Sequence, residues 1–248
     1  MAHGLIVSLT SFPARIRDVW QVVECMKRQT LLPEHIFLYL ADSQFPNGDG
    51  IPETLRGMED DLFQIKMVGQ DIKSHKKYQY VCAEYPEKLV VLIDDDIYYS
   101  TDMIERMMAE RTRSGNVVSM YCSHIIYKSD GSLAPYQSWP EEYGNSLDRD
   151  LFFGSGGGVL FQPSELYKDL TNIELAMRLT PTADDIWLNA MVRLSGKRVS
   201  KLKSNLILPI KIADDKHLCS VNVSGGANDR QLMAINSHYQ SFINGKVF

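Results

Sequence analysis

The chain has 248 residues, of which 44% are hydrophobic and 23% charged, which suits one large globular domain with a sizeable core. Its formal net charge of -5 argues against a nucleic-acid-binding protein, because such proteins are usually basic. No stretch approaches the roughly 20 apolar residues that cross a bilayer, and the first residues do not form a signal peptide. We therefore expect a cytoplasmic protein with at most peripheral contact at the inner face of a membrane.

Strands and helices alternate over the first hundred residues. Apolar runs predict strands over residues 5–9, 36–40, 63–68 and 89–93. Helical periodicity predicts helices over residues 18–29, 52–58 and 74–84, the last with Ser74 as its N-cap. This order predicts a parallel sheet with crossover helices.

The pattern after residue 100 is less regular. Helices are expected over residues 101–112, from about 163, over 184–194 and over 229–243, and strands over 117–123 and 125–127. Residues 128–150 read as a long loop rich in aromatic residues, Pro and Gly. A glycine-rich segment, residues 154–158, leads into another strand.

Three adjacent carboxylates, Asp94, Asp95 and Asp96, follow the apolar run of residues 89–93. Like charges this close repel, and a divalent cation is the simplest partner because Mn²⁺ and Mg²⁺ prefer oxygen ligands. The carboxyl end of a strand is also where open α/β sheets bind ligands. The segment therefore predicts a metal site with a phosphate site beside it. The alternative is an acidic turn that caps a following helix, although that helix is expected to begin only near Thr101.

A second acidic pair, Asp184 and Asp185, stands at the start of a predicted helix. With Thr182 as N-cap, Asp185 would complete a capping-box-like pattern, and the helix dipole favours acids in the first turn. This structural explanation accounts for one acid better than for two. The functional interpretation places one carboxylate at the reacting group, as a base or a charge stabiliser.

The acidic triplet fits the Asp-x-Asp pattern of nucleotide-sugar glycosyltransferases. Together with the glycine-rich segment and the Asp-Asp-Ile helix start, it resembles the GT-A superfamily over most of the chain, from Leu5 to about Asp229. Residues 93–97 and 184–189 are similar in particular to exostosin-like transferases and to bacterial transferases that build surface polysaccharides.

The resemblance implies a GT-A-like α/β fold with a mostly parallel central sheet, flanking helices and a less regular C-terminal half. Residues 1–248 would form a single glycosyltransferase domain, with a nucleotide-binding half over 1–100 and an acceptor-binding half over 101–248. The activity implied is metal-dependent transfer of a hexose from a nucleotide-sugar, with a UDP-sugar expected. The acceptor would be an oligosaccharide or lipid-linked glycan of lipopolysaccharide or capsule.

The resemblance also implies roles for the acids. Asp96 would bind Mn²⁺ or Mg²⁺ directly, and Asp94 would contact the ribose or a metal-bound water. His217 is a candidate to complete the metal site, although a lone histidine in a loop is more often solvated. Asp185 would stand near the anomeric carbon and the acceptor hydroxyl, with Asp184 beside it.

Further residues would bind the rest of the donor and the acceptor. The expected nucleotide-binding residues are Thr10, Ser11, Phe12, Arg15, Asp42, Lys76, Lys77, Asp94 and Asp95. The expected sugar-binding residues are Gly156, Gly157, Gly158 and Trp139, since glycine lets a ligand approach the backbone. Each group has a plainer explanation: a surface ion pair for Arg15, a solvated helix face for Lys76 and Lys77, a tight turn for the glycines.

Two other functions remain open. A nucleotidyltransferase that makes a nucleotide-sugar also places carboxylates on an α/β sheet, but normally has a glycine-rich phosphate loop after its first strand, which residues 8–13 lack. The second is a carbohydrate- or nucleotide-binding module without catalysis. The intact Asp94, Asp96 and Asp185 argue against the module.

Overall fold

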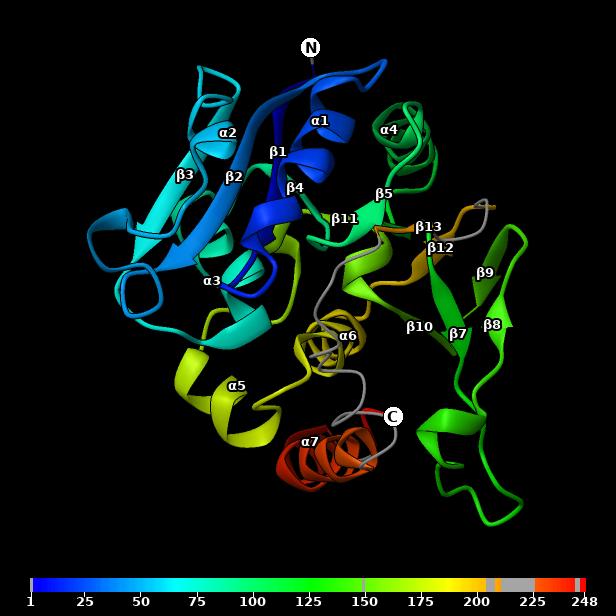
Figure 1. The fold of residues 1–248 in the computed structure, drawn as a ribbon. Helices are drawn as coiled ribbons and strands as arrows, with labels where there is room; N and C mark the ends of the chain where they lie inside the picture. The colour runs from blue at the N-terminus through cyan, green and yellow to red at the C-terminus, as the bar shows by residue number, and fades with distance from the viewer. Residues whose placement is uncertain (1, 149, 204–207, 211–225, 244–245) are drawn as a thin grey trace.

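A computed structural model describes residues 2–148, 150–203, 208–210, 226–243 and 246–248. Its first half forms parallel strands in the spatial order β3-β2-β1-β4 (Figure 1). Their bounds are β1 (Ala2–Thr10), β2 (Pro33–Ala41), β3 (Phe63–Val68) and β4 (Leu89–Leu92). The four strands predicted in this half are confirmed, because parallel strands buried on both faces read as continuous apolar runs.

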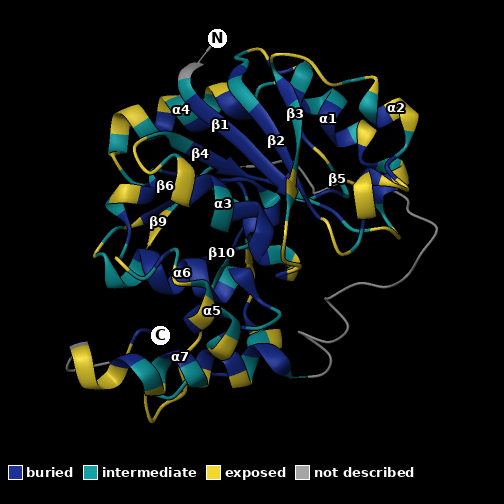
Figure 2. Ribbon diagram, turned by 90° about the vertical axis from the view of Figure 1, so that its left-hand side faces the viewer, coloured by how far each residue is buried: buried dark blue, intermediate teal, exposed yellow. Residues whose placement is uncertain are grey.

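Helices cover both faces of these strands. On one face, α1 (Trp20–Lys27), α2 (Glu53–Arg56) and α4 (Met103–Ser114) pack against a cluster that includes Leu5, Val7 and Leu9. On the other face, α3 (Lys76–Glu84) packs against the intervening Ile6, and the hydroxyl of Ser8 donates to the carbonyl of Lys77. The period-two alternation of β1 thus separates two cores, and Figure 2 shows the sheet buried between them.

The same sheet continues into the second half of the chain. β11 (Val159–Phe161) lies antiparallel beside β4, and β6 (Val117–Ser119), β12 (Val199–Lys201) and β9 (Ser146–Asp148) extend the sheet to eight strands. A smaller sheet has the order β10 (Leu151–Phe153), β7 (Cys122–His124), β8 (Glu141–Glu142). β5 (Ile97–Tyr98) pairs with β13 (Leu208–Pro209).

Three helices complete the second half. α6 (Asp184–Leu194) is almost wholly buried, whereas α5 (Ile173–Leu179) and α7 (Ala227–Ile243) lie at the surface below it (Figures 1 and 2). No helix within the described residues is both long and apolar enough to cross a membrane. The helices predicted over residues 184–194 and 229–243 are confirmed.

Several local predictions were wrong. Residues 128–150 are not a structureless loop, because they contain β8 and β9, and β9 forms an edge of the main sheet. The helix expected from residue 163 is only a 3-10 turn, Pro163–Glu165, and α5 begins at Ile173. Strands of two or three residues are too short to show a period, so pairing with distant segments decides them.

The expected N-caps also differ. A 3-10 turn, Lys73–His75, precedes α3, so its N-cap residue is His75 rather than Ser74. The N-cap residue of α6 is Ala183, and the backbone N–H of Thr182 instead donates to Gln231 on α7. The capping-box explanation of Asp185 is therefore lost.

Candidate functional site

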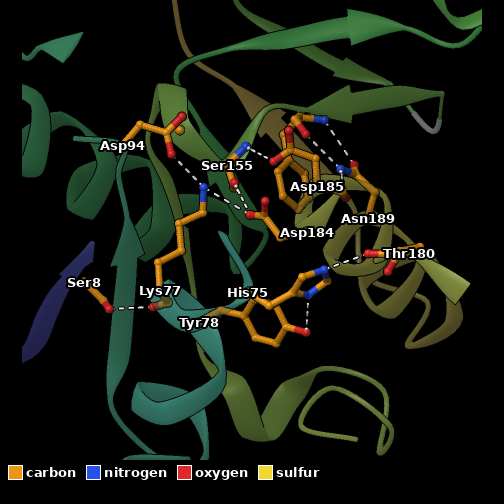
Figure 3. Close-up of polar contacts among 12 residues, drawn as sticks. Ser8, His75, Lys77, Tyr78, Asp94, Ser155, Thr180, Asp184, Asp185 and Asn189 are labelled. Atoms are coloured by element: carbon orange, nitrogen blue, oxygen red, sulfur yellow. Dashed lines mark hydrogen bonds and ion pairs between the residues drawn. The ribbon is translucent and has the colours of Figure 1, made fainter. Parts of the chain in front are cut away.

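A buried lysine joins the two acidic motifs. The Nζ of Lys77, on α3, lies 2.7 Å from Oδ1 of Asp94 and 3.1 Å from Oδ2 of Asp184. Asp94 follows β4 and Asp184 is the first residue of α6, so three elements converge on one ammonium group (Figure 3). Only 3% of the Lys77 side chain is exposed, so its charge is balanced by these carboxylates rather than by water.

The remaining acids of the triplet are held by the loop after β1. Nη1 of Arg15 lies 2.9 Å from Oδ1 of Asp95 and 2.8 Å from Oδ2 of Asp96, and the hydroxyl of Ser11 donates to Asp95. Arg15 and Lys77 therefore offset the repulsion within the triplet, a role for which a divalent cation was expected as the simplest partner. Arg15 does form an ion pair, but its side chain is only 12% exposed, so the pair lies within the site rather than at the surface.

Ser155, in the glycine-rich segment, connects the two acids of α6 to that segment. Its backbone N–H donates to Oδ1 of Asp185 at 2.7 Å, and its hydroxyl donates to Oδ2 of Asp184 at 2.8 Å. Asn189, one turn further along α6, donates to the carbonyls of Asp185 and Phe153 and accepts from the N–H of Phe153. Sequence reasoning assigned neither residue a role, although Asn189 at i+4 from Asp185 was a usable signal.

The two adjacent acids of α6 have opposite pKa shifts. Burial alone would raise the pKa of Asp184, but the charge of Lys77 and the hydroxyl of Ser155 lower it below its ordinary value. Burial and the neighbouring charge of Asp184 raise the pKa of Asp185 well above its ordinary value. Asp185 keeps part of its surface exposed, whereas Asp184 is buried. As the pH falls, the pair therefore takes up its first proton on Asp185, the residue that solvent can reach.

A neutral His75 lies near Asp184 and connects the segments that carry Lys77 and Asp184. Burial lowers the pKa of His75 below its ordinary value. Its Nε2 lies 2.7 Å from the carbonyl of Thr180, which can only accept, so Nε2 carries the proton. Nδ1 then accepts from the hydroxyl of Tyr78 at 3.0 Å (Figure 3). A neutral His75 thus ties the start of α3 to the segment before α6.

The glycines 154–158 make room for neighbouring protein groups. A Cβ on Gly156 would lie 1.8 Å from Oδ2 of Asp94, and one on Gly157 would lie 2.4 Å from Cβ of Tyr121. Gly158 has a φ of 104°, which side chains rarely adopt. The hydroxyl of Tyr99 links the acidic triplet to the glycine-rich segment, because it accepts from the N–H of Asp94 and donates to the carbonyl of Gly156. Approach of a donor sugar to this backbone stays a prediction.

The charges of the site leave an excess of negative charge. Counting described residues, five carboxylates (Asp94, Asp95, Asp96, Asp184 and Asp185) face the cations Lys77 and Arg15. Burial raises the pKa of Asp95 to about 6 despite its contact with Arg15. This excess favours binding of a further cation.

The carboxylate oxygens of the acidic triplet suit a hard divalent cation. A bound phosphate would supply further oxygen ligands to that cation. No three His, Cys, Asp or Glu side chains within the described residues form a ready metal cage. Mg²⁺, however, commonly uses one or two carboxylates together with substrate phosphates and waters. The oxygens of Asp94 and Asp96, both partly exposed, meet that requirement. His217 lies outside the described residues.

The other predicted nucleotide-binding residues have varied surroundings. The hydroxyl of Thr10 donates to the carbonyl of Tyr39 at 2.7 Å, and Phe12 lies under the guanidinium of Arg15. Asp42 is exposed just after β2. Lys76 is buried and pairs with Asp71, away from the acidic motifs. A solvated helix face is therefore wrong for Lys76 and for Lys77.

Trp139 is part of the hydrophobic core. It is only 7% exposed, packs against Tyr136 and Phe152, and donates its indole N–H to the carbonyl of Ala134 at 3.1 Å. Its faces are used by the core, which argues against the expected contact with a sugar, and that contact stays a prediction. A short run of aromatic residues in a polar segment can either pack into the core or form a ligand-binding surface, and sequence alone does not distinguish these two roles.

Comparison with known proteins identifies the fold of this chain but does not assign it to a family. Neither family models nor curated proteins match the chain. Among solved structures, S. aureus TarS 1-349 in complex with UDP matches with a TM-score of 0.52 and 11% identity over 97% of this chain and 72% of that one. The complex of the same protein with UDP-GlcNAc matches with a TM-score of 0.52 and 10% identity, over 96% and 73%.

A third similar structure is a 4-diphosphocytidyl-2C-methyl-D-erythritol synthase. It matches with a TM-score of 0.52 and 9% identity over 92% of this chain and 98% of that one. Identities this low show the fold alone. The predicted GT-A-like α/β fold is confirmed, and membership of an exostosin-like family stays a prediction.

Proposed function

We propose that the protein is a glycosyltransferase that moves a sugar from a nucleotide-sugar to a hydroxyl group of a glycan. The observation that carries the proposal is the contact of Lys77 with both Asp94 and Asp184. It brings an Asp-x-Asp segment and a second carboxylate pair, far apart in the sequence, to the same edge of the sheet. Such a transfer requires charge compensation at a leaving phosphate and a proton acceptor at an attacking hydroxyl.

The diphosphate of the donor would lie against Asp94 and Asp96. A Mn²⁺ or Mg²⁺ ion held by these two residues would stabilise the negative charge that builds on the leaving diphosphate. The surplus of carboxylates over cations supports this assignment. Ser11 and Arg15 hold the triplet in place. Thr10, Phe12 and Asp42, at or just beyond the ends of β1 and β2, are the proposed contacts of the nucleotide.

Asp185 is the proposed catalytic residue. As the acceptor oxygen bonds to the anomeric carbon and the bond from that carbon to the phosphate oxygen breaks, the carboxylate of Asp185 takes the hydroxyl proton. Asp184, paired with Lys77, stays ionised beside it. The Ser155 N–H fixes one oxygen of Asp185, which leaves the other for the acceptor.

A UDP-sugar is the donor we propose first, because the fold is shared with a protein crystallised with UDP and UDP-GlcNAc. The proposed acceptor is an oligosaccharide or lipid-linked glycan of a bacterial surface polysaccharide, reached from the cytoplasm by peripheral contact with the membrane. These finer assignments rest on the sequence resemblance.

The test is turnover of a donor panel. The purified protein is incubated with UDP-, GDP- and CMP-sugars, with and without Mn²⁺, and free nucleotide is measured in the presence of glycan acceptors. We expect Mn²⁺-dependent release of UDP that requires an acceptor and disappears in Asp185→Asn. Binding of the nucleotide without turnover of any donor would instead favour a non-catalytic binding module.

Nucleotidyl transfer is the second candidate, and the similarity to a diphosphocytidyl synthase favours it. The side chains after β1 argue against it, because Ser11 and Arg15 bind Asp95 instead of presenting a glycine-rich loop to a triphosphate. The products separate the two reactions. Nucleotidyl transfer from UTP to a sugar phosphate releases pyrophosphate, whereas glycosyl transfer releases UDP.

A further inference from the structure

Lys77 was expected to contact a nucleotide, but its surroundings indicate another role. Its ammonium group lies between carboxylates from two different elements, at 2.7 Å from Asp94 and 3.1 Å from Asp184. Its backbone is also held, since the hydroxyl of Ser8 on β1 donates to its carbonyl. A lysine that binds a ligand has to present its ammonium to that ligand, whereas this side chain is 3% exposed.

The contacts continue beyond Lys77 to the proposed catalytic residue. Oδ2 of Asp184, which faces Lys77, also accepts from the hydroxyl of Ser155 at 2.8 Å. The backbone N–H of the same serine donates to Asp185 at 2.7 Å. Charged and polar contacts therefore run without a break from Asp94, through Lys77, Asp184 and Ser155, to Asp185 (Figure 3).

We propose that Lys77 is a positioning residue that fixes Asp185 relative to Asp94 by holding Asp184 and, through it, Ser155. Its catalytic consequence rests on the proposed function, because Asp94 lies at the leaving-group end of that reaction and Asp185 at the acceptor end. Transfer needs both ends at a set separation, and misplacement of a reacting group by about 1 Å can cost about 100-fold in rate. The geometric claim, that Lys77 holds the serine and the start of α6, stands independently of the reaction.

The test compares three variants. Lys77→Met removes the charge, Lys77→Arg keeps it, and Lys201→Met is the matched control, because Lys201 on β12 is also buried and lies outside the site. Amide hydrogen exchange is measured by mass spectrometry over residues 154–158 and 184–189. We expect at least about tenfold faster exchange there in Lys77→Met, slower exchange in Lys77→Arg than in Lys77→Met, and wild-type rates over these residues in Lys201→Met.

Kinetics supply the second measurement. In Lys77→Met we expect kcat to fall about 100-fold while KM for the donor and the Kd for UDP change by less than about threefold, and Lys77→Arg to recover at least about tenfold of the loss. A raised Kd with unchanged kcat would make Lys77 a nucleotide ligand and overturn the proposal. Unchanged exchange over residues 154–158 and 184–189 would overturn it as well.

The test of the proposed function and the test of the role of Lys77 can fail independently. Absence of turnover by the wild-type protein with every donor contradicts the proposed function, while the exchange comparison still decides whether Lys77 holds the site together. If Lys77→Met does not fold, Lys77→Arg decides: the proposal requires locally faster exchange than wild type with an unchanged Kd, because the longer, planar guanidinium cannot reproduce both contacts.

Discussion

Gly156 and Asp94 lie so close together that a Cβ on the glycine would be 1.8 Å from Oδ2 of the aspartate. The contact joins the glycine-rich segment to the acidic triplet, and Tyr99 reinforces it by bonding the backbone of both residues. The glycine at this position is therefore explained by an internal contact of the protein.

Gly156→Ala should move the carboxylate of Asp94. We expect the substitution to lower the free energy of unfolding by about 1–3 kcal/mol, as overpacking of a close contact does. Turnover should fall about 100-fold because Asp94 is displaced. Gly69→Ala is the control, since nothing lies within 4 Å of its Cβ position. Denaturant unfolding and donor turnover measure both effects, and equal behaviour of the two variants would contradict the prediction.

Asp185→Asn should separate catalysis from binding. An asparagine oxygen can still accept from the N–H of Ser155, so the fold and the nucleotide site should be kept. We expect kcat to fall about 100- to 10,000-fold, the usual contribution of a general base, with the Kd for UDP nearly unchanged. Calorimetric titration with UDP and an assay of UDP release test this. Wild-type turnover would remove Asp185 from the mechanism.

Asp96→Asn should abolish the metal dependence of nucleotide binding. In the wild-type protein, UDP should raise the thermal unfolding midpoint only when Mn²⁺ is present, because a ligand that binds the folded state stabilises it by mass action. The variant should lose that Mn²⁺-dependent shift while keeping its own midpoint close to wild type, since Arg15 retains its contact with Asp95. An undiminished shift would exclude Asp96 as a metal ligand.

The pH dependence of turnover should report on the two acids of α6. A base has to be ionised, and burial and the charge of Asp184 raise the pKa of Asp185, so it loses its proton at a higher pH than an ordinary aspartate, whose pKa is about 4. The acidic limb of log kcat should therefore lie above that pH, with turnover rising as pH rises. Asp184→Asn removes the neighbouring charge and should shift the limb to lower pH, whereas exposed Asp130→Asn should not. A limb near pH 4 in the wild type would contradict the assignment.

Trp139→Leu should act on stability rather than on acceptor binding. Replacing a buried indole packed against Phe152 should cost about 2–4 kcal/mol of unfolding free energy, whereas Trp20→Leu, at an exposed position, should cost about 0.5 kcal/mol or less. We expect KM for the acceptor to be unchanged in Trp139→Leu. A selective rise of that KM would restore the sequence-based prediction that Trp139 contacts a sugar.

The sequence predicted the first half of the fold well, because long buried strands and crossover helices each have a readable period. It did not predict β9, whose three residues form a strand only because β12, much later in the chain, lies beside them. The acidic residues were found as a motif, but their partners were not. Lys77 sits in a helix that carries two adjacent lysines, and only tertiary structure places Asp94 and Asp184 on its ammonium group.

The antiparallel direction of β11 has a consequence for how the chain can be altered. Val159, where β11 begins, pairs with Leu92 at the end of β4, so the glycine-rich segment meets the acidic triplet there. The other end of β11, at Phe161, lies beside the start of β4, where Phe161 pairs with Val90. Just beyond it, Ser164 donates its backbone N–H to the carbonyl of Pro86. One residue added within β11 would turn every side chain to the opposite face. A tag inserted near the exposed Ser164, beyond the end of β11 at Phe161, would keep the register of β11 and leave the reactive edge intact.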